Sequence, residues 1–487
     1  MKLSSLVAVC IIFATYLPAS GQTQVPTPVN LCKVLAWEAG SLPPSRIQRL
    51  VEERGISFRL NANLRSQLQA AAVNPSLIQF LANHKEIPLQ SANEPCPAQL
   101  VKATRSAHDG NYTAAEDQLK ALLHSDPDNA SLHFALGDVL RQKEEWDTAF
   151  DEFTEAARLE PGFAETHSRL AYVFYRSDDP ESAISEARTA LSIDPSDAEA
   201  YRFLGLGLYG TGQYMAALHA YEESLTREPE NADVYYDIGL ALHDHGDLPA
   251  AAAAYKHALR LRPGFWEAHG NLGVVLHDEG RLIEAVAEYQ AAKRLAPEDA
   301  SVRNNLGNTY CDQGDYTSAI KEFHDLYRLE PDWEGGHSCL ARAFMAQKKY
   351  PAAVEELRTA VRLNPQGAPE RRVLGQALLL SGKPQEAVAE LREAVRLNPS
   401  SALTHHELGT ALYEQEDWSE AEHEFRQAVL LDPSPGNHYS LAACLMTVNR
   451  NEEALAELET ASKLAPSERL YRARKEELLK LMESSAH

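Results

Sequence analysis

The amino-acid sequence predicts an all-α fold built from one repeated element, a pair of helices joined by a short turn. Three residue types recur at one constant spacing and support this prediction. Proline closes each repeat because it cannot continue a helix. It occurs at Pro127, Pro161, Pro195, Pro229, Pro263, Pro297, Pro331, Pro365, Pro399 and Pro433. Pro466 follows at a spacing that is one residue shorter.

Alanine and glycine mark positions where two helices approach each other closely. One alanine position recurs at Ala115, Ala149, Ala183, Ala217, Ala251, Ala285, Ala319, Ala353, Ala387, Ala421 and Ala454. A glycine position recurs at Gly137, Gly205, Gly239, Gly273, Gly307, Gly375 and Gly409. A second glycine position, expected in the turn between the two helices, recurs at Gly212, Gly246, Gly280, Gly314 and Gly382.

The 34-residue period, the leucine–glycine pair, the recurring alanine and the closing proline together resemble the tetratricopeptide repeat family. The resemblance covers residues 98–466. It implies eleven helix-turn-helix repeats that stack into a right-handed superhelical α-solenoid. Residues 467–487 are expected to form an amphipathic C-terminal capping helix, because a solenoid must cover the apolar edge of its last repeat.

The N-terminal part of the chain lacks the repeat pattern. Residues 1–21 combine a basic start, a short apolar stretch and small residues before a cleavage point, which predicts a secretory signal peptide. An uncleaved anchor is the alternative. Residues 22–29 and 88–97 are read as linkers. Between them, residues 30–87 form a small helical module, with helices expected near 30–39, 44–54, 61–72 and 75–84.

The exported chain would contain five cysteines, and an odd number leaves at least one unpaired. Cys32 and Cys96 bracket the N-terminal module and are the one pair proposed here. Such a bridge would close a long loop and stabilise the fold by about 4 kcal/mol. Two free thiols are the alternative, because sequence does not determine their separation.

Charge limits the classes of partner. The chain has 46 basic and 70 acidic residues, for a net charge of −24. That charge repels phosphate backbones and anionic lipids, so nucleic acid and membrane surfaces are not expected as partners. No segment after the signal is apolar enough to span a membrane. A protein or peptide partner is expected, and the sequence does not indicate an oligomeric state.

Two motifs resemble chemical sites. The sequence GLGLYG at 205–210 matches a dinucleotide-binding pattern, but it falls within a helix rather than between a strand and a helix. The sequence LHDHGD at 242–247 recurs one repeat later as LHDEGR at 276–281, so its histidines belong to the repeat rather than to a metal site. No catalytic motif is present, and neither an enzyme nor a cofactor is predicted.

The resemblance implies that function lies in a concave groove lined by five positions on the first helix of each repeat. Asn271 and Asn305 lie one position aside and could contact an extended peptide. The expected groove residues are Tyr172, Tyr175, Arg176, Arg202, Leu206, Tyr209, Tyr236, His243, His277, Asn304, Asn308, Cys311, Arg342 and Arg372. The alternative is a solvated face that binds nothing.

The lysine-rich clamp with which some members of the family hold a C-terminal carboxylate is absent, and Asn308 with Arg342 is the nearest partial match.

From the family resemblance and the signal-like sequence, we predict a non-catalytic protein–protein interaction scaffold, exported to the periplasm or secreted, and placed in a bacterial cell envelope. The alternative is a polysaccharide-handling or export assembly factor, because tyrosines also suit sugar rings.

Overall fold

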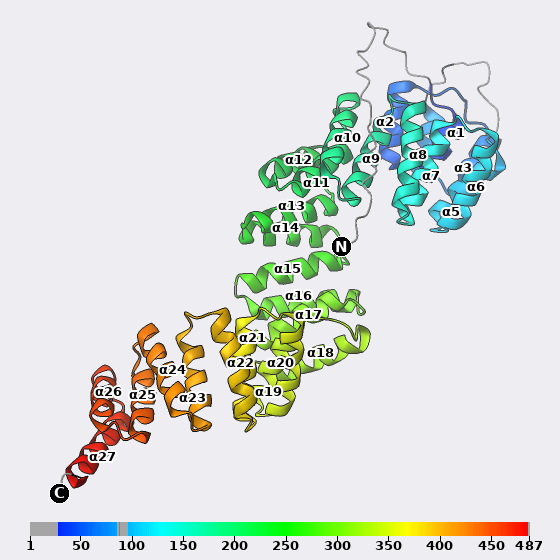
Figure 1. The fold of residues 1–487 in the computed structure, drawn as a ribbon. Helices are drawn as coiled ribbons and strands as arrows, with labels where there is room; N and C mark the ends of the chain where they lie inside the picture. The colour runs from blue at the N-terminus through cyan, green and yellow to red at the C-terminus, as the bar shows by residue number, and fades with distance from the viewer. Residues whose placement is uncertain (1–27, 85–86, 88–95, 486–487) are drawn as a thin grey trace, which may run out of the picture. The chain divides into compact units, whose positions relative to one another are not determined.

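The computed structural model describes residues 28–84, 87 and 96–485, and its regular elements are α-helices (Figure 1). The expected signal peptide at 1–21 and most of the expected linkers at 22–29 and 88–97 lie outside the described residues. An isolated parallel bridge pairs Val29 with Ile56. The chain consists of two compact units, residues 1–229 and 230–487.

The first unit begins with the N-terminal module. Its helices are α1 (Leu31–Ala39), α2 (Pro44–Arg54), α3 (Ala62–Ala70) and α4 (Pro75–Asn83), close to the expected ranges. Asparagine begins three of them, because the side chains of Asn30, Asn61 and Asn74 each accept a hydrogen bond from a backbone N–H in the first turn. Proline at the start of α2 and α4 costs no helical hydrogen bond.

Helix pairs follow the module in the first unit. We call the first helix of each pair the A helix and the second the B helix. The pairs are α5 (Ala98–His108) with α6 (Tyr112–Ser125), α7 (Ala130–Gln142) with α8 (Trp146–Leu159), α9 (Ala164–Arg176) with α10 (Pro180–Ile193), and α11 (Ala198–Gly210) with α12 (Tyr214–Arg227).

The second unit continues the same pattern to the C-terminus. Its pairs are α13 (Ala232–His245) with α14 (Leu248–Leu261), α15 (Trp266–Asp278) with α16 (Leu282–Leu295), α17 (Ala300–Asp312) with α18 (Tyr316–Leu329), α19 (His337–Ala346) with α20 (Tyr350–Leu363), α21 (Ala368–Leu380) with α22 (Pro384–Leu397), α23 (Ala402–Glu414) with α24 (Trp418–Leu431), and α25 (Pro435–Thr447) with α26 (Asn451–Leu464). Helix α27 (Arg469–Ser485) follows them.

The turn between A and B helices has a left-handed residue in every pair. Glycine supplies it at Gly110 and at the five positions expected from the sequence, all with positive φ. In the other turns a residue other than glycine occupies this position, and its left-handed conformation has a modest free-energy cost. These residues are Glu144, Asp178, Lys348, Glu416 and Asn449.

Close packing between A and B helices explains the recurring small residues. All eleven recurring alanines have an exposed fraction of 0%. The mid-helix glycines face a large side chain of the B helix. A Cβ atom added at Gly205 would lie 2.3 Å from Tyr221, and one at Gly239 would lie 2.4 Å from Tyr255. Glycine is therefore required at these positions for lack of space rather than for backbone conformation.

The N-terminal module and the first repeats share one hydrophobic core that runs from Val29 to Val173. Helix α1 packs on the A helices α5 and α7. The Trp37 ring stacks on Phe163 with 5.5 Å between ring centroids, and Gly40 leaves room for the Phe134 ring. The module expected at 30–87 is therefore part of the first compact unit and has no separate core.

At the other end of the chain, α27 packs on α26. Leu478 is completely buried in the core of the last repeats, and the ring of Tyr471 lies 5.2 Å from that of Tyr439. Leu470 and Leu481, two other leucines of the expected cap, are half exposed. Leu478 is thus the buried leucine of the expected cap, and Tyr471 and Met482 also pack on the last repeats.

Two disulfides are present among the described residues. One joins the proposed pair, Cys32 at the start of α1 and Cys96 just before α5. The other joins Cys311 of α17 to Cys339 of α19, a pairing that the sequence analysis did not propose. Cys444 is free and buried, and this burial raises the pKa of its thiol to about 11.

Candidate interaction groove

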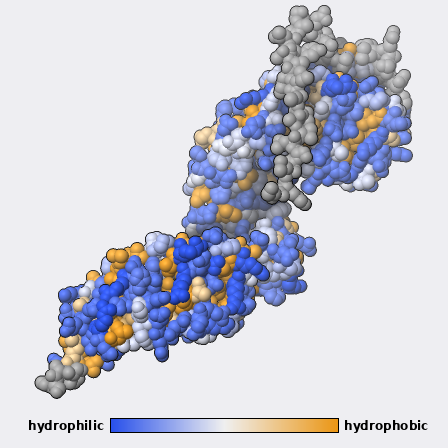
Figure 2. Space-filling view, in the orientation of Figure 1, coloured by the Kyte–Doolittle hydropathy of each residue, from blue (hydrophilic) through white to orange (hydrophobic). Residues whose placement is uncertain are grey.

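The A helices lie on the inner side of each unit. Neighbouring A helices contact one another, as α9 contacts α11 in the first unit and α13 contacts α15 in the second. Among the described residues, successive B helices make no comparable contacts. The face expected to bind a partner is therefore the concave side of each unit. The view in Figure 2 shows a mainly hydrophilic surface with small hydrophobic areas.

The groove of the first repeats is filled by the chain itself. Phe134 and Asp138 on α7 stand in the same repeat positions as Tyr236 and Leu240 on α13, and both are completely buried. Helix α1 covers this face through its contacts with α5 and α7. The sequence analysis did not foresee this occupancy, because it placed the module apart from the array.

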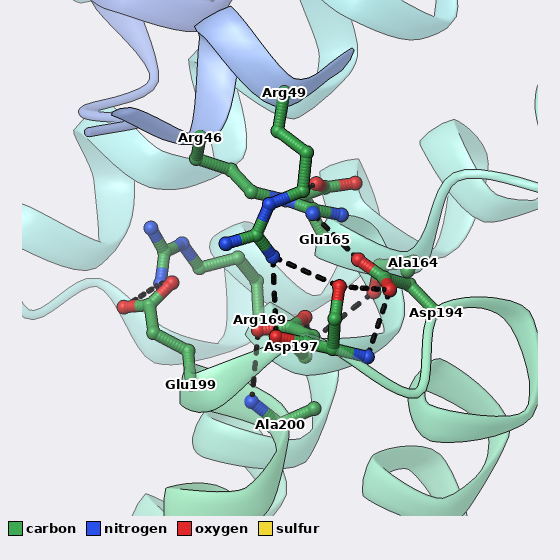
Figure 3. Close-up of polar contacts among 11 residues, drawn as sticks. Arg46, Arg49, Ala164, Glu165, Arg169, Asp194, Asp197, Glu199 and Ala200 are labelled. Atoms are coloured by element: carbon green, nitrogen blue, oxygen red, sulfur yellow. Dashed lines mark hydrogen bonds and ion pairs between the residues drawn. The ribbon is translucent and has the colours of Figure 1, made fainter. Parts of the chain in front are cut away.

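Arginine side chains of α2 contact the first turn of α9 and the turn that precedes α11 (Figure 3). Arg46 binds both Glu165 and Asp194, and its contact with Asp194 is 2.5 Å. Arg49 donates hydrogen bonds to the Ser196 hydroxyl and carbonyl oxygens at 2.9 and 3.2 Å. Arg54 binds Glu160, which occupies the position equivalent to Asp194 in the preceding repeat. One helix thus contacts equivalent turns of two successive repeats.

A second layer of the network lies beneath these contacts. Arg169 binds Glu199 at 2.8 Å, and Ser168 donates a hydrogen bond to Asp197 at 2.7 Å. Burial raises the pKa of Glu165 to about 7, because loss of solvent outweighs the attraction of Arg46. Burial, followed by the nearby charge of Glu199, also raises the pKa of Asp197.

Beyond the module, the first unit presents an aromatic and arginine cluster. The Arg176 guanidinium lies 4.6 Å from the centre of the Trp146 ring and donates a hydrogen bond to the Tyr172 hydroxyl at 3.3 Å. Tyr172 packs between Trp146 and Phe203. Sequence reasoning missed Trp146 because it begins the B helix α8. Tyr175, Arg202 and Tyr209 are partly buried on neighbouring A helices.

The second unit carries a ladder of polar contacts between successive A helices. His243 contacts Asp278 at 3.3 Å, and His277 makes the equivalent contact with Asp312 at 3.0 Å. Arg342 also binds Asp312, at 2.8 Å. Burial opposes the charge of Asp312, but the hydrogen bonds from Arg342 and His277 hold the pKa of this carboxyl below its usual value.

Other expected groove residues contact one another or the next repeat. Asn271 donates a hydrogen bond to the Tyr236 hydroxyl at 2.9 Å, and Trp333 contacts Asn304 at 3.4 Å. Arg372 binds Glu407 at 2.8 Å. Asn304, Asn305 and Asn308 are partly buried along α17, and Asn304 contacts Asn305.

Three expected groove residues have a different environment. Leu206 is buried, because at this position the leucine side chain packs into the core of the first unit. Cys311 is buried in a disulfide and offers no thiol to a ligand. The Tyr236 ring lies 4.9 Å from that of Phe265 and 5.8 Å from that of Tyr255, so it supports packing.

Within the described residues, no group of three or more His, Cys, Asp or Glu side chains is arranged to hold a metal ion. The GLGLYG sequence lies within helix α11, so its glycines do not form a phosphate-binding loop. In the part of the chain that the structure covers, no helix is both long and apolar enough to cross a bilayer.

Comparison with known families identifies the repeat. A model described as tetratricopeptide repeat matches residues 107–164, 204–264, 244–300 and 340–402, a second matches 378–440, and a third matches 300–328. These matches cover more than half of the chain. The chain is a tetratricopeptide repeat (TPR) protein. The models leave α9–α10 and most of α25–α26 unmatched, so the number of eleven TPRs stays a prediction.

A search of curated proteins finds no match. Solved structures similar to this TPR protein include YrrB, described as "a TPR protein with an unusual peptide-binding site", at 26% identity over 40% of this chain and 97% of YrrB, with a TM-score of 0.32. PilF of Pseudomonas aeruginosa is 22% identical over 45% and 97% of the two chains, with a TM-score of 0.39. Yeast Tom70 is 16% identical over 79% and 94%, with a TM-score of 0.33.

Proposed function

We propose that this TPR protein is a non-catalytic scaffold that binds a peptide or a segment of a protein partner in the concave groove. The TPR fold is generally that of a protein-interaction scaffold. The observation that carries the proposal is the module itself. Helix α1 packs on the A helices α5 and α7, and Arg46 and Arg54 of α2 bind Glu165 and Glu160, which supports the idea that a chain segment can bind beside this face.

The partner-binding part of the groove then lies beyond the module. In the second unit, the face around Asn308, Asp312 and Arg342 combines acceptors, donors and a half-exposed guanidinium. Such groups can pair with the backbone of a bound segment. Export of the chain to a periplasmic or secreted location in a bacterial cell envelope is part of the proposal and is supported by the signal-like sequence at 1–21.

Site-specific photocrosslinking in the native host tests the proposed groove. A photoreactive amino acid replaces Arg342 in one variant and Tyr209 in another. Lys256 and Lys321, exposed on the B helices α14 and α18, are replaced in two control variants. We expect the same protein partner to be captured from the groove positions and not from the controls. Capture from the B-helix positions alone would contradict the groove assignment.

The aromatic cluster of the first unit supports a second candidate, a factor that handles or helps export polysaccharide. Trp146 and Tyr172 lie beside Arg176, and the buried Phe203 ring packs on Tyr172. Aromatic rings beside polar groups suit sugar rings as well as peptides. Glycan and peptide arrays probed with the wild-type chain and with Trp146→Ala separate the candidates, because only the second predicts glycan binding that this substitution removes.

A further inference from the structure

One ionic contact recurs within six repeats. In each of them a histidine near the start of the A helix binds, through Nδ1, a glutamate at a fixed position of the B helix. The pairs are His133–Glu152 at 2.6 Å, His167–Glu186 at 2.8 Å, His269–Glu288 at 2.6 Å, His337–Glu356 at 2.7 Å, His405–Glu424 at 2.5 Å and His438–Glu457 at 2.5 Å. We call these contacts the His–Glu clasps. Each clasp joins the two helices of a single repeat.

The second ring nitrogen shows which form of histidine fits. In four clasps, Nε2 lies 2.8–3.3 Å from the carbonyl oxygen of the proline that closes the preceding repeat. A carboxylate and a carbonyl both accept hydrogen bonds, so both ring nitrogens must donate. Only the imidazolium has a proton on both nitrogens. The neutral ring would turn a lone pair toward one of the two oxygens.

Two other repeats make the same contacts with a permanent cation. Arg371 stands at the clasp position and binds Glu390 at 2.7 Å and the Pro365 carbonyl at 3.1 Å. Arg303 binds the Pro297 carbonyl at 2.7 Å and lies 3.5 Å from Glu322. Guanidinium and imidazolium therefore occupy one site in different repeats. This position of the repeat therefore accommodates a positively charged side chain.

Repeats at α11–α12 and α13–α14 lack the clasp. Alanine replaces the glutamate at Ala220 and Ala254, and tyrosine replaces the histidine at Tyr201 and Tyr235. Arg227 lies over the Tyr201 ring at 4.1 Å, and His257 stacks on Tyr235 at 3.8 Å. These two repeats contain no carboxylate–imidazole pair at this site and provide an internal reference.

We propose that the His–Glu clasps make the repeats more stable at acidic pH than at alkaline pH. Protonated histidines join the A and B helices through ion pairs, and this stabilisation is lost when the histidines lose their protons. The clasp side chains are mostly shielded, with histidines 8–18% exposed, so solvent screens the pairs less than it screens pairs at the surface. The inference does not depend on the proposed function.

Each clasp histidine faces a carboxylate. Besides the six clasp glutamates, Glu155 lies near His133, and the Tyr327 ring stacks on His337. Hydrogen bonding to Glu152, opposed by burial and aided by the Pro127 carbonyl, raises the pKa of His133 above its ordinary value. At His133 the raised pKa in the folded state means that the stabilisation by this clasp is complete below about pH 6.5 and is lost as the pH rises through the folded value.

Two sets of variants of the full chain test the proposal. One changes all six clasp histidines to arginine, as in the two repeats that already carry arginine, and the other changes them to glutamine. Thermal unfolding is measured at pH 5.5 and pH 8.5 with the disulfides intact. We expect the wild type to melt about 5 °C higher at pH 5.5 than at pH 8.5. The arginine set should lose at least half of this difference by gaining stability at pH 8.5.

The glutamine set should melt lower than the wild type at pH 5.5 and close to it at pH 8.5. Glu165, whose raised pKa also lies near neutrality, is present in every variant, so its contribution to the pH dependence cancels when variants are compared.

Hydrogen exchange adds a local measurement that does not need the glutamine set to be stable. In the wild type, protection of α15–α16 and α23–α24 should fall between pH 5.5 and 8.5 after correction for intrinsic exchange, and that of α11–α14 should not. An equal pH response in the wild type and the arginine set would overturn the proposal.

Discussion

At the scale of single residues, glycine meets two different physical demands in this chain. Gly246 lies in a turn with a φ of 93°, and no atom would contact a Cβ there, so its role is conformational. Gly239 lies in mid-helix with no positive φ, and its role is to leave space for Tyr255. The register of the repeat separates the two roles in the sequence, because each kind of glycine recurs at its own position.

Replacing Gly239 by alanine tests the requirement for space. The added Cβ would lie 2.4 Å from the Tyr255 ring, and that ring is fully buried and cannot move aside. We expect a loss of about 1–3 kcal/mol from overpacking, despite the better helix propensity of alanine. Urea unfolding measures the change. Gly264→Ala is the matched control, because nothing lies within 4 Å of its added Cβ, and equal effects of both substitutions would contradict the packing role.

At the scale of helices, sequence reasoning succeeded where contacts lie within one repeat. The recurring alanines and glycines record the A–B packing, and the closing prolines record where B helices end, so helix positions followed from their spacing. Contacts that do not recur from repeat to repeat leave no periodic pattern in the sequence. Docking of α1 on α7, the Cys311–Cys339 disulfide and the ring contact of Trp146 with Tyr172 each join residues whose partners do not recur.

Arg46→Ala tests how α2 is held on the repeats. The substitution would leave Glu165 and Asp194 without the guanidinium that binds both of them, and Glu165 is buried. Breaking a buried pair of this kind costs about 3 kcal/mol. We expect hydrogen exchange to increase in α1 and α2 while α9 and α10 stay protected. Arg65→Ala, on α3 in the same module, should leave the protection of α1 and α2 unchanged; a similar increase there would count against a specific role for Arg46.

Removing residues 467–487 tests the role of α27. The truncation takes away Leu478 from the core shared with Leu445 and Leu458, and it removes the contact of Lys475 with Glu459. Each repeat is stabilised mainly by its neighbours, so the damage should remain local. We expect faster hydrogen exchange in α25 and α26 and unchanged exchange in α13–α16. Unchanged protection of α25 and α26 would show that α27 is not a cap.

At the scale of the whole molecule, both units share a repeated framework, and each has its own set of groove residues. The framework is set by the packing positions, which are nearly constant from repeat to repeat. The groove positions vary, from a face covered by the chain's own module in the first unit to a polar ladder of His, Asp and Arg in the second. Binding specificity can therefore change without altering the residues that hold the fold.

The groove of the second unit gives the last prediction. Asn308→Ala combined with Arg342→Ala removes one partly buried and one exposed side chain, so the melting temperature should change by less than about 3 °C. The captured partner should bind more than tenfold more weakly, which corresponds to about 1.4 kcal/mol. Arginine often contributes strongly at interfaces because it combines buried area with directed hydrogen bonds. Isothermal titration calorimetry measures the affinity, and Lys256→Ala with Lys321→Ala on the B helices is the matched control. If the control pair weakens binding and the groove pair does not, the partner contacts the outer face and the ladder serves only to join the A helices.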